Sequence, residues 1–134
     1  MFKKDYNFGK QSEIQLLKQF QEYFNDTTIE SLDNYNAFDF KGEKKYIELK
    51  SRHNTYNKYD TTMIGCNKLQ QARIYDGLGY DIFFVFNFTD GIYYWKYTND
   101  NKLEKKIGGR VDRGRPEIKD YYFIPISYLS KLIV

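Results

Sequence analysis

Two acidic residues and a lysine stand close together in the stretch AFDFKGEKKYIELKSR: Asp39 lies in one apolar run, and Glu48 and Lys50 alternate with the apolar residues of the next. Because side chains two apart in a strand share a face, Glu48 and Lys50 point to the same side of a predicted strand. Carboxylate oxygens suit Mg²⁺ or Mn²⁺, which polarise a phosphodiester oxygen and lower the pKa of a bound water. A lysine beside them can orient that water or neutralise charge on the phosphate. The three residues form a candidate site for metal-dependent phosphodiester hydrolysis.

The distance between the two carboxylates depends on the turn between their strands. We predict a turn whose two central residues are Gly42 and Glu43, so that Asp39 pairs with Tyr46 and lies diagonally from Glu48. Diagonal neighbours are about 7–8 Å apart at the backbone, close enough for both carboxylates to reach one ion. The alternative is an exposed cross-strand ion pair, which contributes only a few tenths of a kcal/mol (~0.2–1).

An acidic residue two positions before a lysine is common in this chain. The spacing occurs at Asp39, Glu43, Glu48, Asp100, Glu104 and Glu117. Only Glu48 lies inside a predicted apolar strand with an aspartate on the neighbouring strand. The context of Glu48, rather than the spacing, therefore singles it out.

A third carboxylate is predicted to face the sheet from the first helix. Glu13 is in phase with Leu17, Phe20 and Phe24, the apolar stripe of a helix expected over Lys10–Phe24. A carboxylate facing the core is costly unless it is compensated, and a shared metal would compensate it. The alternative is favourable placement near a helix N-terminus.

The hydrophobic pattern predicts the order α-β-β-β-α-β-β followed by a short tail. We expect helices at Lys10–Phe24 and Cys66–Leu78, strands at Thr27–Glu30, Tyr35–Phe40, Lys44–Ser51, Asp81–Phe88, Ile92–Thr98 and Tyr121–Ile126, loops at His53–Thr62 and Lys102–Lys119, and a terminal helix at Ser127–Ile133. The second helix acts as a crossover that makes the strands on either side of it parallel. The expected fold class is α/β, a central mixed β-sheet flanked by helices in one domain over residues 1–134.

Composition places few limits on the partner. The net charge is +3, but Lys and Arg outnumber Asp and Glu between Lys102 and Lys119, so this segment is either a solvated loop or a phosphate-binding one. Cys66 is the single cysteine, so no intramolecular disulfide can form. No apolar run is long enough for a secretion signal or a membrane span. We expect a soluble intracellular protein, in the cytoplasm or a viral or host nucleoid, without a membrane partner.

At this point the residues resemble the PD-(D/E)XK nuclease superfamily over roughly Lys10–Phe88. The matching residues are Gly9 and Glu13 in FGKQSE, Asp39 in AFDF, and Glu48 with Lys50 in IELK. The resemblance implies a restriction-endonuclease-like core and a Mg²⁺ site, with Mn²⁺ as a substitute, to which the backbone carbonyl of Leu49 would also contribute. One departure is Ala37-Phe38 before the aspartate, where the family pattern has proline.

The resemblance also implies contacts with DNA. Gln71 and Tyr75 in QQARIY look like the glutamine-and-tyrosine helix motif of the RecB-like branch. The expected nucleic-acid-binding residues are Arg52, Lys68, Gln71, Tyr75, Arg110, Arg113 and Arg115. An ordinary polar helix surface is the alternative for those on the second helix.

Three functions remain open at the level of sequence. The first is a metal-dependent DNA endonuclease or exonuclease. The second is a Holliday-junction resolvase like the archaeal type, a homodimer that would need a self-complementary apolar surface, with Phe83–Phe88 and Ile92–Tyr97 as candidates. The third is a non-catalytic nucleic-acid-binding module, which the carboxylate set argues against because unused like charges are destabilising.

Overall fold

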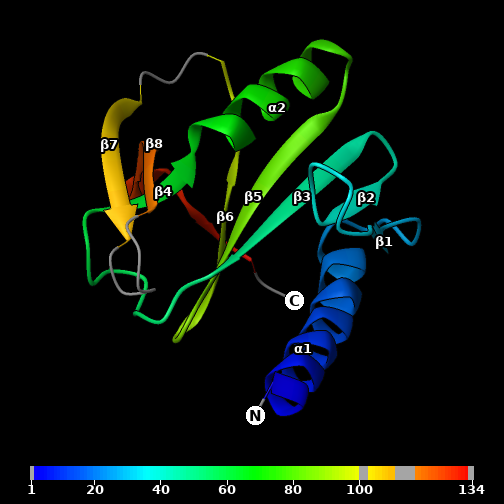
Figure 1. Cartoon of the computed structure of the whole chain (residues 1–134). Coiled ribbons are helices and arrows are strands. Elements are labelled where there is room, and N and C mark those ends of the chain that lie inside the picture. Colours follow the sequence, from blue (N-terminus) through cyan, green and yellow to red (C-terminus); the bar gives the residue numbers. More distant parts are fainter. Residues whose placement is uncertain (1, 100–102, 111–116, 133–134) are drawn as a thin grey trace.

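The computed structural model describes residues 2–99, 103–110 and 117–132, and the side chains of residues 13–99, 103–106 and 120–132. Within these ranges the elements are α1 (Phe2–Tyr23), β1 (Glu30–Ser31), β2 (Phe40–Gly42), β3 (Lys45–Ser51), β4 (Thr61–Gly65), α2 (Cys66–Gly77), β5 (Asp81–Phe88), β6 (Gly91–Lys96), β7 (Glu104–Arg110), β8 (Glu117–Pro125), a 3₁₀ helix η1 (Ile126–Tyr128) and β9 (Ser130–Lys131). The fold is α/β with a mixed central sheet, as the sequence predicts (Figure 1).

The central sheet has the strand order β1-β2-β3-β5-β6-β9. Strands β3 and β5 pair in parallel from Lys45↔Asp81 to Ser51↔Asn87, and α2 connects them, which confirms the predicted crossover. The other pairs in this sheet are antiparallel. Strand β5 is buried from Ile82 to Phe86, as expected for a central strand covered on both faces.

Helix α1 covers one face of the central sheet. Its residues Leu16 and Phe20 are buried and pack with Phe40, Ile47 and Val85 of the sheet. The predicted apolar stripe therefore does face the sheet, although the helix begins at Phe2 and not near Lys10.

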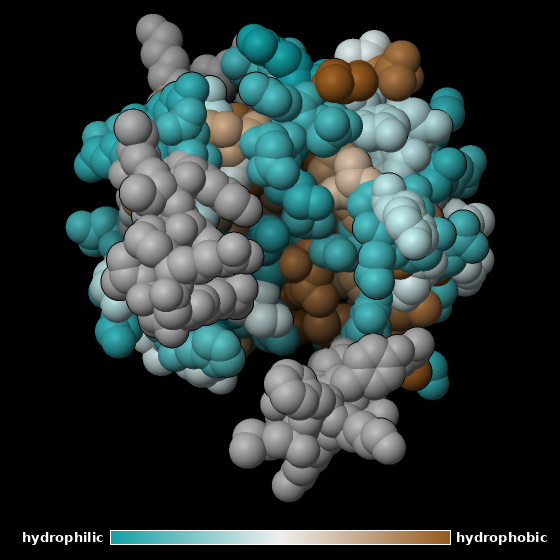
Figure 2. All heavy atoms as spheres, in the orientation of Figure 1, coloured by the Kyte–Doolittle hydropathy of each residue, from teal (hydrophilic) through white to brown (hydrophobic). Residues whose placement is uncertain are grey.

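The opposite face of the central sheet is covered by α2 and by a second sheet with the strand order β4-β8-β7 (Figure 1). Ala72 of α2 packs with Ile64 of β4, Ile124 of β8, and Phe84 and Phe86 of β5. The molecule thus has three layers, with the candidate site between the central sheet and α2. Hydrophilic side chains cover most of the face drawn in Figure 2, and hydrophobic atoms are visible in a central hollow below α2.

Of the two strands suggested as a dimer surface, Phe83–Phe88 lies inside the molecule, whereas Ile92, Tyr93 and Tyr94 of the second are half-buried. Phe84, Val85 and Phe86 are fully buried, and Trp95 of the neighbouring strand is 3% exposed. Side chains of α1, α2 and the second sheet of the same chain pack against these apolar residues. Phe83–Phe88 is therefore not available for a partner, and that part of the prediction is wrong.

The β2–β3 turn differs from the prediction by one residue. The pairs are Gly42↔Lys45 and Lys41↔Tyr46, so the two central turn residues are Glu43 and Lys44. Lys44, the second central residue, has a φ of 54°, in the left-handed region. The predicted Asp39–Tyr46 pair is therefore wrong, because Tyr46 pairs with Lys41, and the N–H of Asp39, just before β2, donates to the carbonyl of Ile47.

Asp26 fixes this turn to the end of α1. Its buried carboxylate accepts hydrogen bonds from the backbone N–H of Glu43 at 2.9 Å and from Lys45 Nζ at 2.7 Å. The backbone N–H and the side-chain hydroxyl of Thr28 also donate to it. Burial acts to raise the pKa of Asp26, but these hydrogen bonds outweigh it and hold that pKa well below its usual range. Gly42 is needed beside it, because a Cβ there would lie 2.6 Å from Asp26 Oδ2.

Several other element predictions are wrong. The expected loop Lys102–Lys119 contains β7 and the first residues of β8, Glu117 to Lys119. The two strands pair antiparallel. The expected loop His53–Thr62 ends early because β4 begins at Thr61. The expected terminal helix is a short 3₁₀ turn followed by β9. The strands expected at Thr27–Glu30 and Tyr35–Phe40 are short and start later, at Glu30 and Phe40.

None of the described helices is long and apolar enough to cross a membrane.

Candidate active site

Asp39 is fixed to β3 by its backbone and by its side chain. Its N–H donates to the carbonyl of Ile47 at 3.0 Å, and its Oδ2 accepts from the N–H of Leu49 at 2.7 Å. The residue between these two on β3 is Glu48. The bend before β2 therefore brings the Asp39 carboxylate next to the Glu48 carboxylate, more directly than the diagonal arrangement predicted from sequence.

Glu48 is a buried carboxylate, with 2% of the residue exposed. It lies on the α2 side of the sheet, where Lys50 Nζ is 3.4 Å and Lys68 Nζ 3.2 Å from its Oε2. Burial, repulsion by Asp39 and a hydrogen bond to Asp39 raise the pKa of Glu48 to about 7, and the two lysines offset these effects only in part. A pair of adjacent carboxylates that is costly to ionise in this way is typical of a functional site.

Lys68 comes from the first turn of α2. Besides the ion pair with Glu48, its Nζ donates a hydrogen bond to the backbone carbonyl of Ala37. It thus connects α2 to β3 and to the segment that carries Asp39. The sequence predicted a nucleic-acid contact for Lys68, but the ion pair depends on tertiary packing, and no sequence signal pointed to it.

Glu13 faces the same open pocket as Asp39. This pocket, with a volume of about 350 Å³, is lined by Glu13, Leu32, Asp33, Asn34, Asn36, Asp39, Phe40, Leu49, Ser51 and Lys68. Within the part of the chain that the structure describes, no three Asp, Glu, His or Cys side chains lie close enough together to hold a metal ion. The structure thus brings Asp39, Glu48 and Lys50 together, and Glu13 lies outside that cluster, on the lining of the pocket that Asp39 shares.

A second open pocket adjoins the first along α2. Its volume is about 470 Å³, and it is lined by Tyr35, Asn36, Ala37, Asn67, Lys68, Gln71 and Tyr75. Asn36 and Lys68 line both pockets, and we call the two together the α2 groove. Gln71 and Tyr75 therefore lie beside the candidate site, although the ring of Tyr75 also packs against Tyr46 at 4.8 Å between centroids.

Of the arginines predicted to bind nucleic acid, Arg52 is the one whose side chain the structure describes. Arg52 Nη2 donates to the backbone carbonyl of Met63 at 2.7 Å, and its guanidinium lies over the ring of Phe86, so it ties the end of β3 to β4. Arg110 is the last residue of β7, and its side chain is not described. Arg113 and Arg115 lie outside the described residues.

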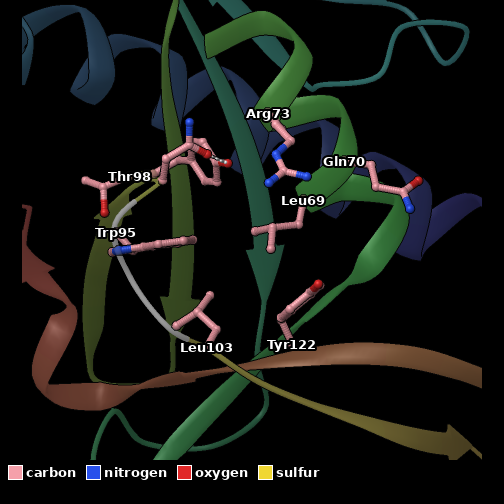
Figure 3. A pocket seen from close by; sticks show the side chains of 9 residues that line it. Leu69, Gln70, Arg73, Trp95, Thr98, Leu103 and Tyr122 are labelled. Carbon is pink, nitrogen blue, oxygen red and sulfur yellow. Dashed lines mark hydrogen bonds between the residues drawn. The ribbon is translucent and has the colours of Figure 1, made fainter. Parts of the chain in front are cut away.

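The far side of α2 borders a separate cavity of about 160 Å³ (Figure 3). Arg73 and Leu69 reach it from α2, Trp95 from β6 and Tyr122 from β8. The helix therefore presents Lys68, Gln71 and Tyr75 to the α2 groove and different residues to this cavity.

The parallel β3–β5 pair with its crossover helix, together with Asp39 just before β2 and the Glu48-x-Lys50 pair on β3, defines a PD-(D/E)XK nuclease core. The family model described as "Phage putative PDDEXK endonuclease" matches residues 8–132, and the chain belongs to that family. The match includes the strands after β5, beyond the Lys10–Phe88 range of the sequence resemblance. Comparisons with curated proteins and with solved structures found no match.

Proposed function

We propose that this protein is a metal-dependent DNA endonuclease that hydrolyses phosphodiester bonds at the cluster of Asp39, Glu48 and Lys50. The observation that carries the proposal is the buried Glu48 carboxylate against Asp39, with the amino groups of Lys50 and Lys68 at 3.4 and 3.2 Å from its Oε2. Buried like charges cost stability, and a site that binds a cation explains why they are kept. Membership of a phage endonuclease family supports the same chemistry.

The donor set fits a hard divalent cation. The carboxylates of Asp39 and Glu48 would hold Mg²⁺ or Mn²⁺ with the backbone carbonyl of Leu49, since all of these ligands are oxygen atoms. Glu13, which lines the same pocket as Asp39, would bind the ion directly or through a water. When bound, the ion lowers the pKa of a water and polarises a phosphoryl oxygen.

The residues of the chain have separate tasks. Asp39 is kept in position by the N–H of Leu49, so its orientation does not depend on substrate. Lys50, one-third exposed, is placed to orient the attacking water or to stabilise charge on the phosphate. Lys68 neutralises Glu48 and becomes available for a phosphate once Glu48 has another cationic partner.

The alternatives from sequence have less support. A junction-resolving homodimer needs an interface, and Phe83–Phe88, one candidate for it, is buried within the chain. In a non-catalytic binding module, the Asp39–Glu48 pair would lower the stability of the fold without serving a function.

The test is cleavage by the purified protein of labelled supercoiled plasmid, linear duplex, single strand and four-way junction, each with Mg²⁺, with Mn²⁺ and with chelator. We expect metal-dependent cutting that falls by about 10²-fold or more in Lys50→Ala, because a charge-stabilising group is lost. Lys96→Ala is the matched control, since that lysine is exposed and makes only a long ion pair of 3.7 Å. Cutting that survives chelation, or that Lys50→Ala leaves unchanged, would refute the proposal, and preference for the junction would favour the resolvase.

A further inference from the structure

The segment from Leu32 to Asp39 forms an ordered loop at the edge of the α2 groove, and we call it the Tyr35 loop. The N–H of Leu32 donates to the carbonyl of Asp39 at 2.8 Å and closes the loop at its base. Asp33 Oδ1 accepts hydrogen bonds from the N–H of Tyr35 at 3.0 Å and from Nδ2 of Asn36 at 2.7 Å. The Asp33 side chain therefore forms the turn that carries Tyr35.

The C-terminal end of this loop, from Ala37 to Asp39, is tied to the candidate active site. Its last residue is Asp39, whose carboxylate is bound to β3. The carbonyl of Ala37 accepts a hydrogen bond from Lys68, which also pairs with Glu48. A group on the loop thus keeps a fixed place relative to the two carboxylates.

The side chain at the tip of the loop is Tyr35, which is 98% exposed. A single exposed aromatic residue is ordinary, and exposure alone indicates nothing. Tyr35, however, lines the α2 groove together with Gln71 and Asn67, whose amides can hydrogen-bond to the edges of a base. Lys68 lines both pockets of the α2 groove. One pocket offers the ring of Tyr35 and the amides of Asn67 and Gln71, and the other offers the carboxylate of Asp39.

We propose that Tyr35 stacks on an unpaired nucleobase next to the phosphate that is cut. This inference rests on the proposed function and narrows the substrate to DNA that has an unstacked base at the site, such as a single-stranded end. Aromatic side chains bind single strands by stacking on base faces, which are hidden by neighbouring bases in a continuous duplex. Lys68, between the two parts of the groove, is placed to pair with the intervening phosphate.

The test is DNA binding in Ca²⁺, measured by fluorescence anisotropy, on a blunt duplex and on the same duplex with a single-stranded overhang carrying 2-aminopurine. We expect tighter binding of the overhang, accompanied by quenching of 2-aminopurine. Tyr35→Ala should weaken binding to the overhang by about 5- to 100-fold and remove the quenching, with little change on the blunt duplex. Tyr35→Phe should keep both, because the ring remains.

Tyr128→Ala is the matched control, since Tyr128 is 42% exposed and lines neither part of the α2 groove. Equal binding of the overhang duplex by the wild type and Tyr35→Ala would overturn the inference. So would an equal loss of affinity for the blunt and overhang duplexes in Tyr35→Ala, or failure of the wild type to bind the overhang duplex. The readout does not depend on cleavage. Tyr35-dependent binding without any cutting would refute the proposed endonuclease alone, and cutting that is indifferent to Tyr35 would refute the stacking alone.

Discussion

Glu48 is a buried carboxylate, and its charged form needs nearby positive charges to stabilise it. It is almost fully buried, and its acidic neighbour, Asp39, is held beside it by a hydrogen bond from the N–H of Leu49. Lys50 and Lys68 lie 3.4 and 3.2 Å from its carboxylate, yet the pKa of Glu48 is still raised to about 7. The free energy of unfolding is therefore lowered by the arrangement that the proposed chemistry requires.

This arrangement predicts how stability varies with pH. Because the pKa of Glu48 is higher in the folded than in the unfolded state, its contribution to stability is full below about pH 4.5 and is lost as pH rises through about 7. Between pH 5 and 8, in chelator, the wild type should lose about 2–3 kcal/mol of unfolding free energy relative to Glu48→Gln, measured by urea denaturation. Glu22→Gln, at an exposed position on α1, is the control and should follow the wild type. If Glu48→Gln shows the same pH dependence as the wild type, the carboxylate is not strained as described.

At the residue scale the sequence predicted part of the site. The grouping of Asp39, Glu48 and Lys50 follows from strand periodicity, which depends only on local geometry. The ion pair of Lys68 with Glu48 depends on where α2 packs. The exposed Tyr35 could not be foreseen either, because the Asp33 side chain turns a segment that looked like a strand into a loop.

At the scale of elements, the turn between β2 and β3 sets the register that aligns the two carboxylates. Sequence spacing predicted β3, α2 and β5 nearly to the residue, because each has a clear hydrophobic period or run. The register was wrong by one residue because the contact between Asp26 and the N–H of Glu43, which favours the later turn, comes from a distant part of the chain.

Asp26 should therefore be important for stability although it lies outside the candidate site. Asp26→Asn removes a buried charge that pairs with Lys45 and accepts the turn's N–H, and it should cost about 3–5 kcal/mol in urea denaturation at pH 7. Because the pKa of Asp26 is lowered, this stabilisation is present above pH 4 or so and is lost in acid. Asp81→Asn is the matched control, since its pair with Lys96 is more than half exposed and should contribute under about 1 kcal/mol.

Gly42→Ala tests the same contact from the other side, because its new Cβ would lie 2.6 Å from Asp26 Oδ2 and 2.7 Å from Ile29 Cγ1. We expect a loss of about 1–3 kcal/mol. Losses for Asp26→Asn and Gly42→Ala no larger than that of Asp81→Asn would show that the turn is fixed in some other way.

At the scale of the molecule, three layers bring the candidate site together. The central sheet carries Asp39, Glu48 and Lys50, α1 brings Glu13 to the same pocket, and α2 brings Lys68. The sequence predicted these layers because β5 is apolar on both faces and needs cover on both sides. The second sheet was missed because the charged residues of Glu104–Arg110 resemble a solvated loop, and because the pairing of β4 with β8 joins segments far apart in sequence.

The most direct test of the account is a calorimetric titration of Mn²⁺ into the wild type, Asp39→Asn, Glu48→Gln and Lys50→Ala at pH 8, with each variant's folding checked by thermal denaturation. We predict binding to the wild type, loss of about tenfold or more in affinity for the two carboxylate variants, and retained binding in Lys50→Ala, which should nevertheless fail to cut DNA. Mn²⁺ binding that is unchanged in both Asp39→Asn and Glu48→Gln would contradict the account, because the ion would then be held elsewhere.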